Sequence, residues 1–267
     1  MTSDPEFLSF HLTRVTREYD AVTKGADSTT RAVGPDGKEF QVKRAGPGGL
    51  RDMPIIEFTC YWVAVQTGTR VPCFEILEMQ DSTWAFGSVI LVGYTTLEEQ
   101  FTAFNLHFNP QWKSVLARVF TEIYTLDCFL GNPDRHFGNY MFKWSHELGQ
   151  QLELVAIDFS RALTGSGQFP PLQFPPLGNP PNTNTRTYTE KWRPVYGFDV
   201  KAAEQVVTRL RDISTDSLGA ILNKTPNDWR VGGTYNFLLD WWPESRDVHI
   251  QNLERHISML SSDGRGY

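Results

Sequence analysis

The sequence contains few cysteines, no long hydrophobic run and no excess of basic charge. Its three cysteines are an odd number, and no pair of them has the close spacing of a zinc knuckle. No apolar stretch approaches the length that crosses a bilayer. The net charge of −6 argues against a nucleic-acid partner held mainly by charge. We therefore expect neither direct nucleic-acid binding nor attachment to a membrane.

The cysteines and the first residues both bear on the cellular compartment. Cys60 and Cys128 lie in apolar helical patterns, so both are predicted to be buried thiols, which fits a reducing compartment. The chain begins Met-Thr-Ser-Asp-Pro-Glu, which is not the start of a secretory signal. The sequence therefore predicts a soluble cytoplasmic protein.

Composition and patterning predict a folded protein with a strand-rich first third. The 267 residues are 40% hydrophobic and 21% charged, so a packed core is expected. That length suits one large domain, or a small lobe and a larger lobe that share a cleft. The predicted elements of the first third are strands at 29–33, 39–43, 71–79 and 84–92, and a helix from Pro54 to Gly68.

The rest of the chain is predicted to be mainly helical. Apolar residues at helical spacing predict a long core helix from Trp112 to Leu130. A second β-hairpin is predicted from 140–144 and 152–157. Residues 164–193 are rich in Pro, Gly, Asn and Thr, and are predicted to form a long loop that is neither helix nor strand. Helical patterns return from about Val200 to the end.

The most informative motif is Asn132-Pro-Asp-Arg-His-Phe-Gly-Asn139, followed by Leu152-Glu-Leu-Val-Ala-Ile-Asp-Phe-Ser160. It places Asp134 and Asn139 five positions apart in a turn and ends an apolar strand on Asp158. Phosphoryl transfer needs one carboxylate to orient a hydroxyl, and a carboxylate plus an amide oxygen to hold magnesium. A hairpin that starts at Asn139 and returns at Asp158 brings these two side chains to the same edge. The motif therefore predicts three catalytic residues, Asp134, Asn139 and Asp158, of which the last two are magnesium ligands.

Each of these residues also has an alternative interpretation, in which its role is purely structural. Asp and Asn are common turn formers, and Asp158 could cap a neighbouring element. The joint pattern is much rarer than its parts, which favours the functional interpretation. Arg135 and His136 receive no assignment, because a structural imidazole is at least as reasonable as a catalytic one.

The first third supplies a candidate cation for the nucleotide. Lys43, at the end of a predicted strand, is placed to meet phosphates as a point charge. Glu57, on the following helix, could hold this lysine by an ion pair. Glu57 lies among apolar residues, where a carboxylate usually has a partner. Lys38 and Arg44 are near alternatives to Lys43.

Backbone donors for phosphates are predicted just before the first strand. The stretch Lys24-Gly-Ala-Asp-Ser-Thr-Thr30 offers amides and hydroxyls, and we assign Gly25, Ser28 and Thr29 to cofactor binding. The signal is weak, because the sequence contains neither a Gly-x-Gly-x-x-Gly motif nor a P-loop.

These motifs together resemble the HipA-like kinases, bacterial members of the wider protein-kinase-like superfamily. The resemblance covers nearly the whole chain, from near Gly25 to the final helices. The Asp-Arg-His order, with Asn139 five residues after Asp134, is also similar to the phosphoinositide kinases. The matching pieces are Glu39-Phe-Gln-Val-Lys43, Glu57 in its apolar helix, Thr69-Arg-Val-Pro72, Trp84-Ala-Phe-Gly-Ser88, the turn from Leu130 to Asn139, and Ile157-Asp-Phe-Ser160.

The resemblance implies an α+β, two-lobed kinase fold that binds ATP and Mg²⁺ in its cleft. Residues 1–95 would form the small lobe and residues 96–267 the larger, mostly helical lobe. Carried over by motif, Asp134 would be the catalytic base, Asn139 and Asp158 the magnesium ligands, and Lys43 with Glu57 the nucleotide lysine and its partner. The adenine would lie near the end of the 84–92 strand, at Ile90 and Val92.

The resemblance also implies partners, namely a protein with a Ser or Thr hydroxyl and, for members that act as toxins, an antitoxin or regulatory protein. Two departures matter here. The magnesium motif is Asp-Phe-Ser instead of Asp-Phe-Gly. The chain is shorter than full-length HipA toxins and shows no additional N-terminal domain, so a toxin-antitoxin role is possible but does not follow automatically from the resemblance.

Two other functions stay open at this point. One is a small-molecule or lipid kinase, which the Asp-Arg-His order favours, although the acidic charge and the lack of a basic amphipathic helix give no membrane anchor. The other is a kinase fold used only as a binding module, with the Pro-rich stretch from Phe169 to Pro181 as a partner surface. Retention of both predicted magnesium ligands disfavours the second.

Overall fold

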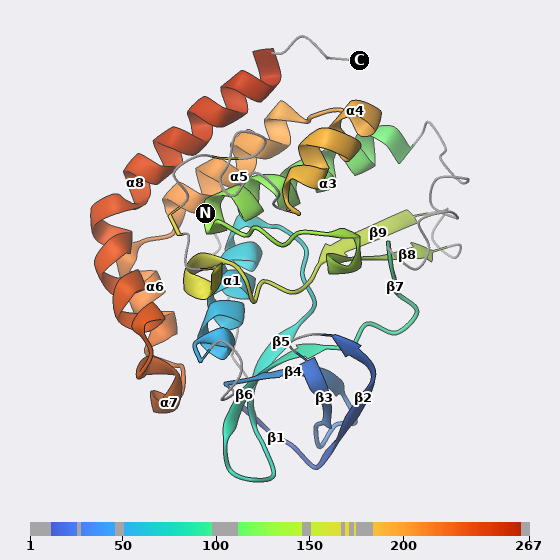
Figure 1. The fold of residues 1–267 in the computed structure, drawn as a ribbon, viewed down its shortest axis with the longest axis vertical. Helices are drawn as coiled ribbons and strands as arrows, with labels where there is room; N and C mark the ends of the chain where they lie inside the picture. Colours follow the sequence, from blue (N-terminus) through green and yellow to red (C-terminus); the bar gives the residue numbers. More distant parts are fainter. Residues whose placement is uncertain are drawn as a thin grey trace, which may run out of the picture.

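The computed structural model describes residues 12–25, 28–45, 51–97, 112–145, 151–166, 169–170, 174 and 184–262. Within these residues a strand-rich N-terminal part with one helix is followed by a mainly helical part (Figure 1). The strands of a small second sheet lie on both sides of the long helix α3 (Lys113–Leu130) in the sequence. No helix of the described part combines the length and hydropathy that a membrane span requires.

The N-terminal sheet has six strands in the order β1-β5-β6-β4-β3-β2. The hairpin predicted from 29–33 and 39–43 is present, with Thr30 opposite Val42. The strands are β1 (Leu12–Arg14), β2 (Arg17–Gly25), β3 (Ser28–Val33), β4 (Glu39–Arg44), β5 (Phe74–Glu78) and β6 (Trp84–Val89).

The stretch from Lys24 to Thr30 was expected to precede the first strand, and this expectation is wrong. Gly25 ends β2 and pairs with Ser28 at the start of β3, so the stretch is the turn of a hairpin. The residues at the tip of this turn, 26 and 27, lie outside the described residues. The largely polar strand β2 carries no clear apolar alternation, which is why the sequence pattern did not reveal it.

Helix α1 (Met53–Thr67) packs against both the N-terminal sheet and the helical part. Pro54 stands in its first turn, where the missing N–H is not needed, and Gly68 ends it with a left-handed φ of 75°. Every residue from Met53 to Ala64 is buried, because the helix is hydrophobic on all sides and is enclosed by β4, β6, α5, α7 and α8. Its residue Glu57 is therefore held in a fixed position.

A second, three-stranded sheet has the order β7-β8-β9. Its strands are β7 (Thr95–Thr96), β8 (Tyr140–Ser145) and β9 (Gln151–Ala156), with Tyr140 opposite Ala156. The predicted second hairpin is thereby confirmed. The first sheet ends at Val89, and the division of the chain at residue 95 stays a prediction.

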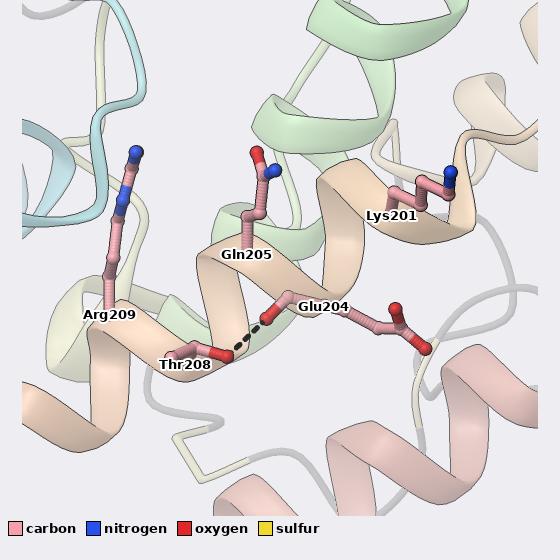
Figure 2. Close-up of a pocket in the computed structure, with 5 residues that line it drawn as sticks. All are labelled: Lys201, Glu204, Gln205, Thr208 and Arg209. Atoms are coloured by element: carbon pink, nitrogen blue, oxygen red, sulfur yellow. Dashed lines mark hydrogen bonds between the residues drawn. The ribbon is translucent and has the colours of Figure 1, made fainter.

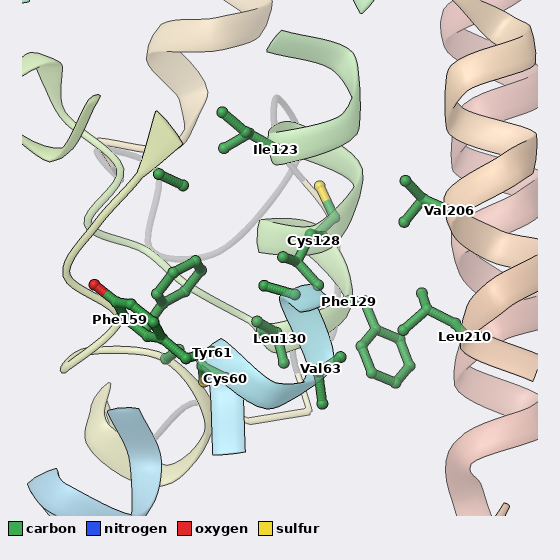
Figure 3. Close-up of a cluster of buried hydrophobic side chains, with 14 of the residues drawn as sticks. Cys60, Tyr61, Val63, Ile123, Cys128, Phe129, Leu130, Phe159, Val206 and Leu210 are labelled. Atoms are coloured by element: carbon green, nitrogen blue, oxygen red, sulfur yellow. The ribbon is translucent and has the colours of Figure 1, made fainter. Parts of the chain in front are cut away.

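The helical part is built around α3 (Lys113–Leu130), the predicted core helix. Phe159 and side chains of α1, α3 and α5 belong to one hydrophobic cluster that includes both Cys60 and Cys128 (Figure 3). The other helices are α5 (Val200–Asp212), α6 (Thr215–Leu222), α7 (Asn227–Arg230) and α8 (Gly233–Ser262). The 30-residue α8 contains Pro243, so the apolar spacing at its C-terminal end revealed only part of it.

The segment 164–193 was expected to be neither helix nor strand, and this is wrong at both ends. A 3-10 helix spans Leu163–Ser166, and a π-helical turn (Tyr188–Trp192) continues into α4 (Arg193–Tyr196). The reason is tertiary packing: the ring of Tyr188 stacks on Tyr124 at 4.4 Å and that of Trp192 on Phe120 at 5.0 Å, both on α3. Most of the Pro-rich middle lies outside the described residues.

Candidate nucleotide and magnesium site

The turn after α3 is shaped by Asn132. Helix α3 ends at Gly131, whose φ of 62° turns the chain out of the helix. Asn132 Nδ2 donates a hydrogen bond of 2.8 Å to Asp127 Oδ1 on α3, and its Oδ1 accepts one of 3.1 Å from the backbone N–H of Asp134. The turn is thus fixed to the core helix, and Asp134 follows at a defined place.

Asp134 and Asn139 lie at opposite ends of the turn, and a hydrogen bond connects them. Asn139 is buried, and its Nδ2 donates to the backbone oxygen of Asp134 at 2.9 Å, which leaves the amide oxygen as its other polar atom. Asp134 is half-buried, and its Oδ1 accepts a hydrogen bond of 2.7 Å from Asn184 Nδ2.

Asp158 follows β9 at the same end of the hairpin as Asn139. The backbone N–H of Ile157 donates to the oxygen of Asn139 at 3.1 Å, which extends the ladder by one pair. Asp158 has a φ of 57°, a left-handed conformation uncommon outside glycine, and such residues cluster at functional sites. Ser160 Oγ donates a hydrogen bond of 2.8 Å to Asp158 Oδ1 and so holds the Asp158 carboxylate.

Lys43 joins the two sheets at this point. Its Nζ lies 3.0 Å from Asp158 Oδ2 and 3.7 Å from Glu57 Oε1. Glu57 Oε2 accepts a hydrogen bond of 3.1 Å from the backbone N–H of Phe159, so the glutamate also contacts the Asp-Phe-Ser segment. The structure therefore brings together β4, α1 and the segment after β9.

The two near alternatives to Lys43 point elsewhere. Lys38 pairs with Asp36 at 2.9 Å and with Glu75, and Arg44 pairs with Glu18 and Asp81. The side chains of Lys38 and Arg44 are themselves 49% and 29% exposed. Of these three cations, Lys43 is the one that reaches Asp158.

The charges of this cluster are set by burial and by Lys43. Burial raises the pKa of Glu57 to about 8, with the charge of Lys43 opposing and that of Asp158 adding to the rise. Burial also raises the pKa of Asp158, but Lys43 and the hydrogen bond from Ser160 outweigh it and hold this pKa well below its usual range. Asp158 is therefore ionised at neutral pH and presents a negatively charged oxygen beside Lys43.

The remaining predicted cofactor residues come from the β2–β3 turn and from the chain that follows β6. Gly25, Ser28 and Thr29 stand at the β2–β3 turn. Ile90 is half-buried after β6, and its backbone N–H donates to Glu39 at 2.8 Å. Val92 is 86% exposed. Strand β3 lies beside β4, which carries Lys43, and the role of these five residues in cofactor binding stays a prediction.

Arg135 is a site residue that the sequence interpretation left unassigned. Its side chain is 1% exposed, and its Nε and Nη2 donate to the two carboxylate oxygens of Asp127 at 2.8 and 3.0 Å. Its Nη1 donates to the backbone oxygen of Asn139 at 2.7 Å and also to that of Ile157. The arginine thereby joins α3, the turn that carries Asp134 and the end of β9. A signal was available, because Asp127 interrupts the apolar pattern of a core helix and a buried carboxylate needs a partner.

An open pocket of about 320 Å³ lies elsewhere, along α5. Figure 2 shows its lining side chains spaced along one helix, with Arg209 reaching past the end of α1. Arg209 Nη1 donates a hydrogen bond of 2.7 Å to the backbone oxygen of Thr67, so Arg209 satisfies a carbonyl group at the C-terminal end of α1. None of the lining residues, Lys201, Glu204, Gln205, Thr208 and Arg209, is a predicted site residue, and we attach no chemistry to this pocket.

Comparison with known proteins shows the fold but no close relative. No protein-family model matches the chain, and no curated protein matches it. The structure is similar to the crystal structure of a Helicobacter pylori proinflammatory kinase, CtkA, with a TM-score of 0.57 over 89% of this chain and 94% of that chain, at 14% identity. The chain has a protein-kinase-like fold.

A second similar structure is WaaP in complex with acyl carrier protein, with a TM-score of 0.36 over 91% of this chain and 89% of that chain, at 12% identity. At these identities the similarities concern the fold alone. The predicted α+β, two-lobed fold is confirmed: a β-sheet with one helix forms the N-terminal lobe, and the second lobe is mainly helical.

Proposed function

We propose that this protein is an ATP- and Mg²⁺-dependent phosphotransferase, a HipA-like kinase that transfers the γ-phosphoryl group to a Ser or Thr hydroxyl of a protein. The observation that carries the proposal is the contact of 3.0 Å between Lys43 Nζ and Asp158 Oδ2, with Asn139 at the same hairpin end. A nucleotide lysine and two oxygen ligands at one place are what phosphoryl transfer requires.

Asp158 and Asn139 fit the demands of Mg²⁺. The ion prefers oxygen ligands, uses one or two protein groups and takes its other ligands from phosphates and water. An ionised carboxylate and an amide oxygen meet that demand, and the Asp158 side chain is 33% exposed, so a ligand can reach it. The described residues contain no group of three His, Cys, Asp or Glu side chains, as a metal held by protein alone would need. Bound there, Mg²⁺ would neutralise charge that develops on the phosphates.

Lys43 and Glu57 form the nucleotide-binding part of the proposal. The ammonium group of Lys43 is buried between two carboxylates, and it is a point charge suited to phosphate oxygens. Glu57 is fixed by α1 and by the backbone N–H of Phe159. It therefore keeps Lys43 in place when Asp158 turns toward a cation.

Asp134 is the proposed acceptor of the hydroxyl proton. It stands on a turn that Asn132 and Arg135 fix to α3, so its carboxylate is presented by rigid elements. Transfer of the γ-phosphoryl group breaks its bond to the β-phosphate oxygen and forms one to the hydroxyl oxygen, and the hydroxyl proton passes to Asp134.

A transfer assay with labelled ATP, Mg²⁺ and a panel of dephosphorylated proteins tests this proposal. Wild type is expected to label a protein, and Asp134→Ala and Asp158→Asn to lose at least about 100-fold in rate. Asp36→Asn, a change at an exposed carboxylate in the β3–β4 turn, serves as the matched control and keeps the wild-type rate. Equal absence of transfer in wild type and Asp134→Ala contradicts the proposal.

The acceptor class is tested in the same assay. Protein labelling supports the Ser/Thr kinase, whereas labelling of inositol lipids or small alcohols without protein supports the alternative that the Asp-Arg-His order favours. A toxin role, an antitoxin partner and the cytoplasmic location stay predictions of the sequence.

A further inference from the structure

A corner formed by Asn184 and Thr185 is docked on the turn that carries Asp134. We propose that Asn184 is a positioning residue for phosphoryl transfer, which holds one oxygen of Asp134 so that the other faces the incoming hydroxyl. This inference rests on the proposed function and adds to it a residue outside every motif of the sequence. Asn184 lies at the end of the Pro-rich stretch, 50 positions after Asp134.

The corner is attached to the turn by Thr185. This residue is buried, and its backbone N–H donates to the oxygen of Pro133 at 3.3 Å. Its hydroxyl donates to the backbone oxygen of Asn132 and accepts a hydrogen bond of 3.3 Å from the N–H of Arg135. Three hydrogen bonds thus join Thr185 to three residues of the turn, two before Asp134 and one after it.

The chain after the corner is held by α3. The N–H of Thr187 donates to the oxygen of Asn184 at 2.9 Å, which starts a helical turn. In the next turn, Tyr188 and Trp192 stack on aromatic rings of α3, and the hydroxyls of Tyr188 and Thr121 lie 2.9 Å apart. The corner and the turn are therefore fixed to the same helix, and their relative position is set by packing instead of by loop conformation.

Asn184 reaches Asp134 from this fixed position. Its side chain is exposed, and its Nδ2 donates to Asp134 Oδ1 at 2.7 Å. Among the described residues no hydrogen bond involves Asp134 Oδ2. One carboxylate oxygen is thus occupied by a fixed donor, and the second is the oxygen open to a substrate hydroxyl.

Such a donor matters for transfer and little for folding. A proton acceptor works when its oxygen is held within a fraction of an ångström of the reacting hydroxyl. A single exposed hydrogen bond contributes little to stability, in contrast to the buried bonds of Thr185. The inference therefore separates two neighbours: Asn184 acts on Asp134, and Thr185 keeps the corner in place.

The test compares Asn184→Ala and Asn184→Asp with wild type, using ADP release at saturating Mg-ATP with dephosphorylated casein as the acceptor. Asn184→Asp keeps the size of the side chain and removes the donor. Both variants are expected to lower kcat by about 10- to 100-fold while KM for ATP stays within about twofold, since the nucleotide site is untouched. Asn184→Gln restores an amide donor and is expected to recover part of kcat.

Two further variants separate positioning from structure. Asn227→Ala, at an exposed asparagine on α7, keeps kcat and Tm at wild-type values. Thr185→Ala is expected to lower Tm and kcat together, whereas the Asn184 variants leave Tm unchanged. An active wild type with unchanged kcat in Asn184→Ala, or a fall in kcat matched by a fall in Tm, overturns this inference alone. A wild type with no ADP release above that of Asp134→Ala removes the proposed function and this inference with it.

Discussion

Lys43 Nζ lies 3.0 Å from Asp158 Oδ2, although the two residues are 115 positions apart in the sequence. The lysine comes from the N-terminal sheet, and the aspartate from the segment after the second sheet. Glu57 of α1 is the third member, 3.7 Å from the same nitrogen. The contact exists only when both sheets and α1 are in place, so it depends on the whole arrangement of the two lobes.

Replacing Lys43 by methionine is expected to destabilise the protein as well as abolish transfer. The change leaves the ionised Asp158 and the buried carboxyl group of Glu57 without their cation, and removing one partner of a buried ion pair costs about 3 kcal/mol. Urea unfolding measures the loss. Lys38→Met is the matched control, because the side chain of Lys38 is 49% exposed and its surface pairs contribute little. Equal stability of the two variants contradicts the role given to the Lys43 contact.

Arg135 is expected to tolerate no substitution, including lysine. Its guanidinium makes two hydrogen bonds to Asp127 and two to backbone oxygens, and the ammonium of a lysine has no such fork. Arg135→Lys and Arg135→Ala should each lower the free energy of unfolding by about 3 to 5 kcal/mol. The control is Arg118→Ala, which breaks a pair with Glu122 on the surface of α3 and should change it by less than about 1 kcal/mol. A stable, active Arg135→Lys protein is the contrary result.

Stability is expected to fall as the pH is lowered from 7 toward 4, in part through His256. Burial, together with the charge of Arg193, lowers the pKa of His256 to about 4, from an ordinary value of 6.5. The unfolded chain therefore takes up a proton below pH 6.5 that the folded protein takes up only near pH 4. Stability present above pH 6.5 is lost across this window, by about 3 kcal/mol.

His256→Gln provides the comparison for this pH dependence. The Nε2 atom of His256 lies 2.7 Å from the hydroxyl of Tyr124, and glutamine retains a polar partner for that hydroxyl without a titrating group. Chemical unfolding at several pH values should give a smaller loss of stability between pH 6.5 and 4 in the variant. Parallel curves for the two proteins would show that His256 does not contribute.

Gly68 and Gly37 form a natural pair for testing the end of α1. Both have a left-handed φ, of 75° and 81°, so alanine is strained at each. A Cβ at Gly68 would lie 2.0 Å from Arg209 Nη1, whereas one at Gly37 would meet nothing within 4 Å. Gly37→Ala is expected to cost about 1 kcal/mol, and Gly68→Ala more. Thermal unfolding measures both, and the difference should shrink in an Arg209→Ala background.

Local patterns in the sequence were sufficient for most of the elements that carry the site. Alternation and turn residues placed β3, β4 and the second hairpin, and helical spacing placed α1 and α3. The pairing of Asn139 with Ile157 follows directly from that hairpin. These features are local, because each depends on residues close together in the chain.

The features that the sequence did not reveal depend on contacts between distant segments. Arg135 looks like an ordinary charged turn residue until Asp127 and Ile157 are seen beside it. The helical turns from Tyr188 to Tyr196 form because their aromatic rings pack on α3, although Pro, Thr and Asn in the preceding stretch indicate a loop. The contact of Asn184 with Asp134 also joins distant segments, and no residue close to Asn184 in the sequence indicates it.

The most direct measurement is calorimetric titration of a non-hydrolysable ATP analogue into the protein, with and without Mg²⁺. The account predicts that Mg²⁺ strengthens binding to wild type at least about tenfold, and that Asp158→Asn, which removes the charged ligand but keeps its shape, loses this enhancement. Asp36→Asn should behave as wild type. Analogue binding that does not respond to Mg²⁺, or that responds equally in wild type and Asp158→Asn, would contradict the assignment of Asp158 and Asn139 as the magnesium ligands.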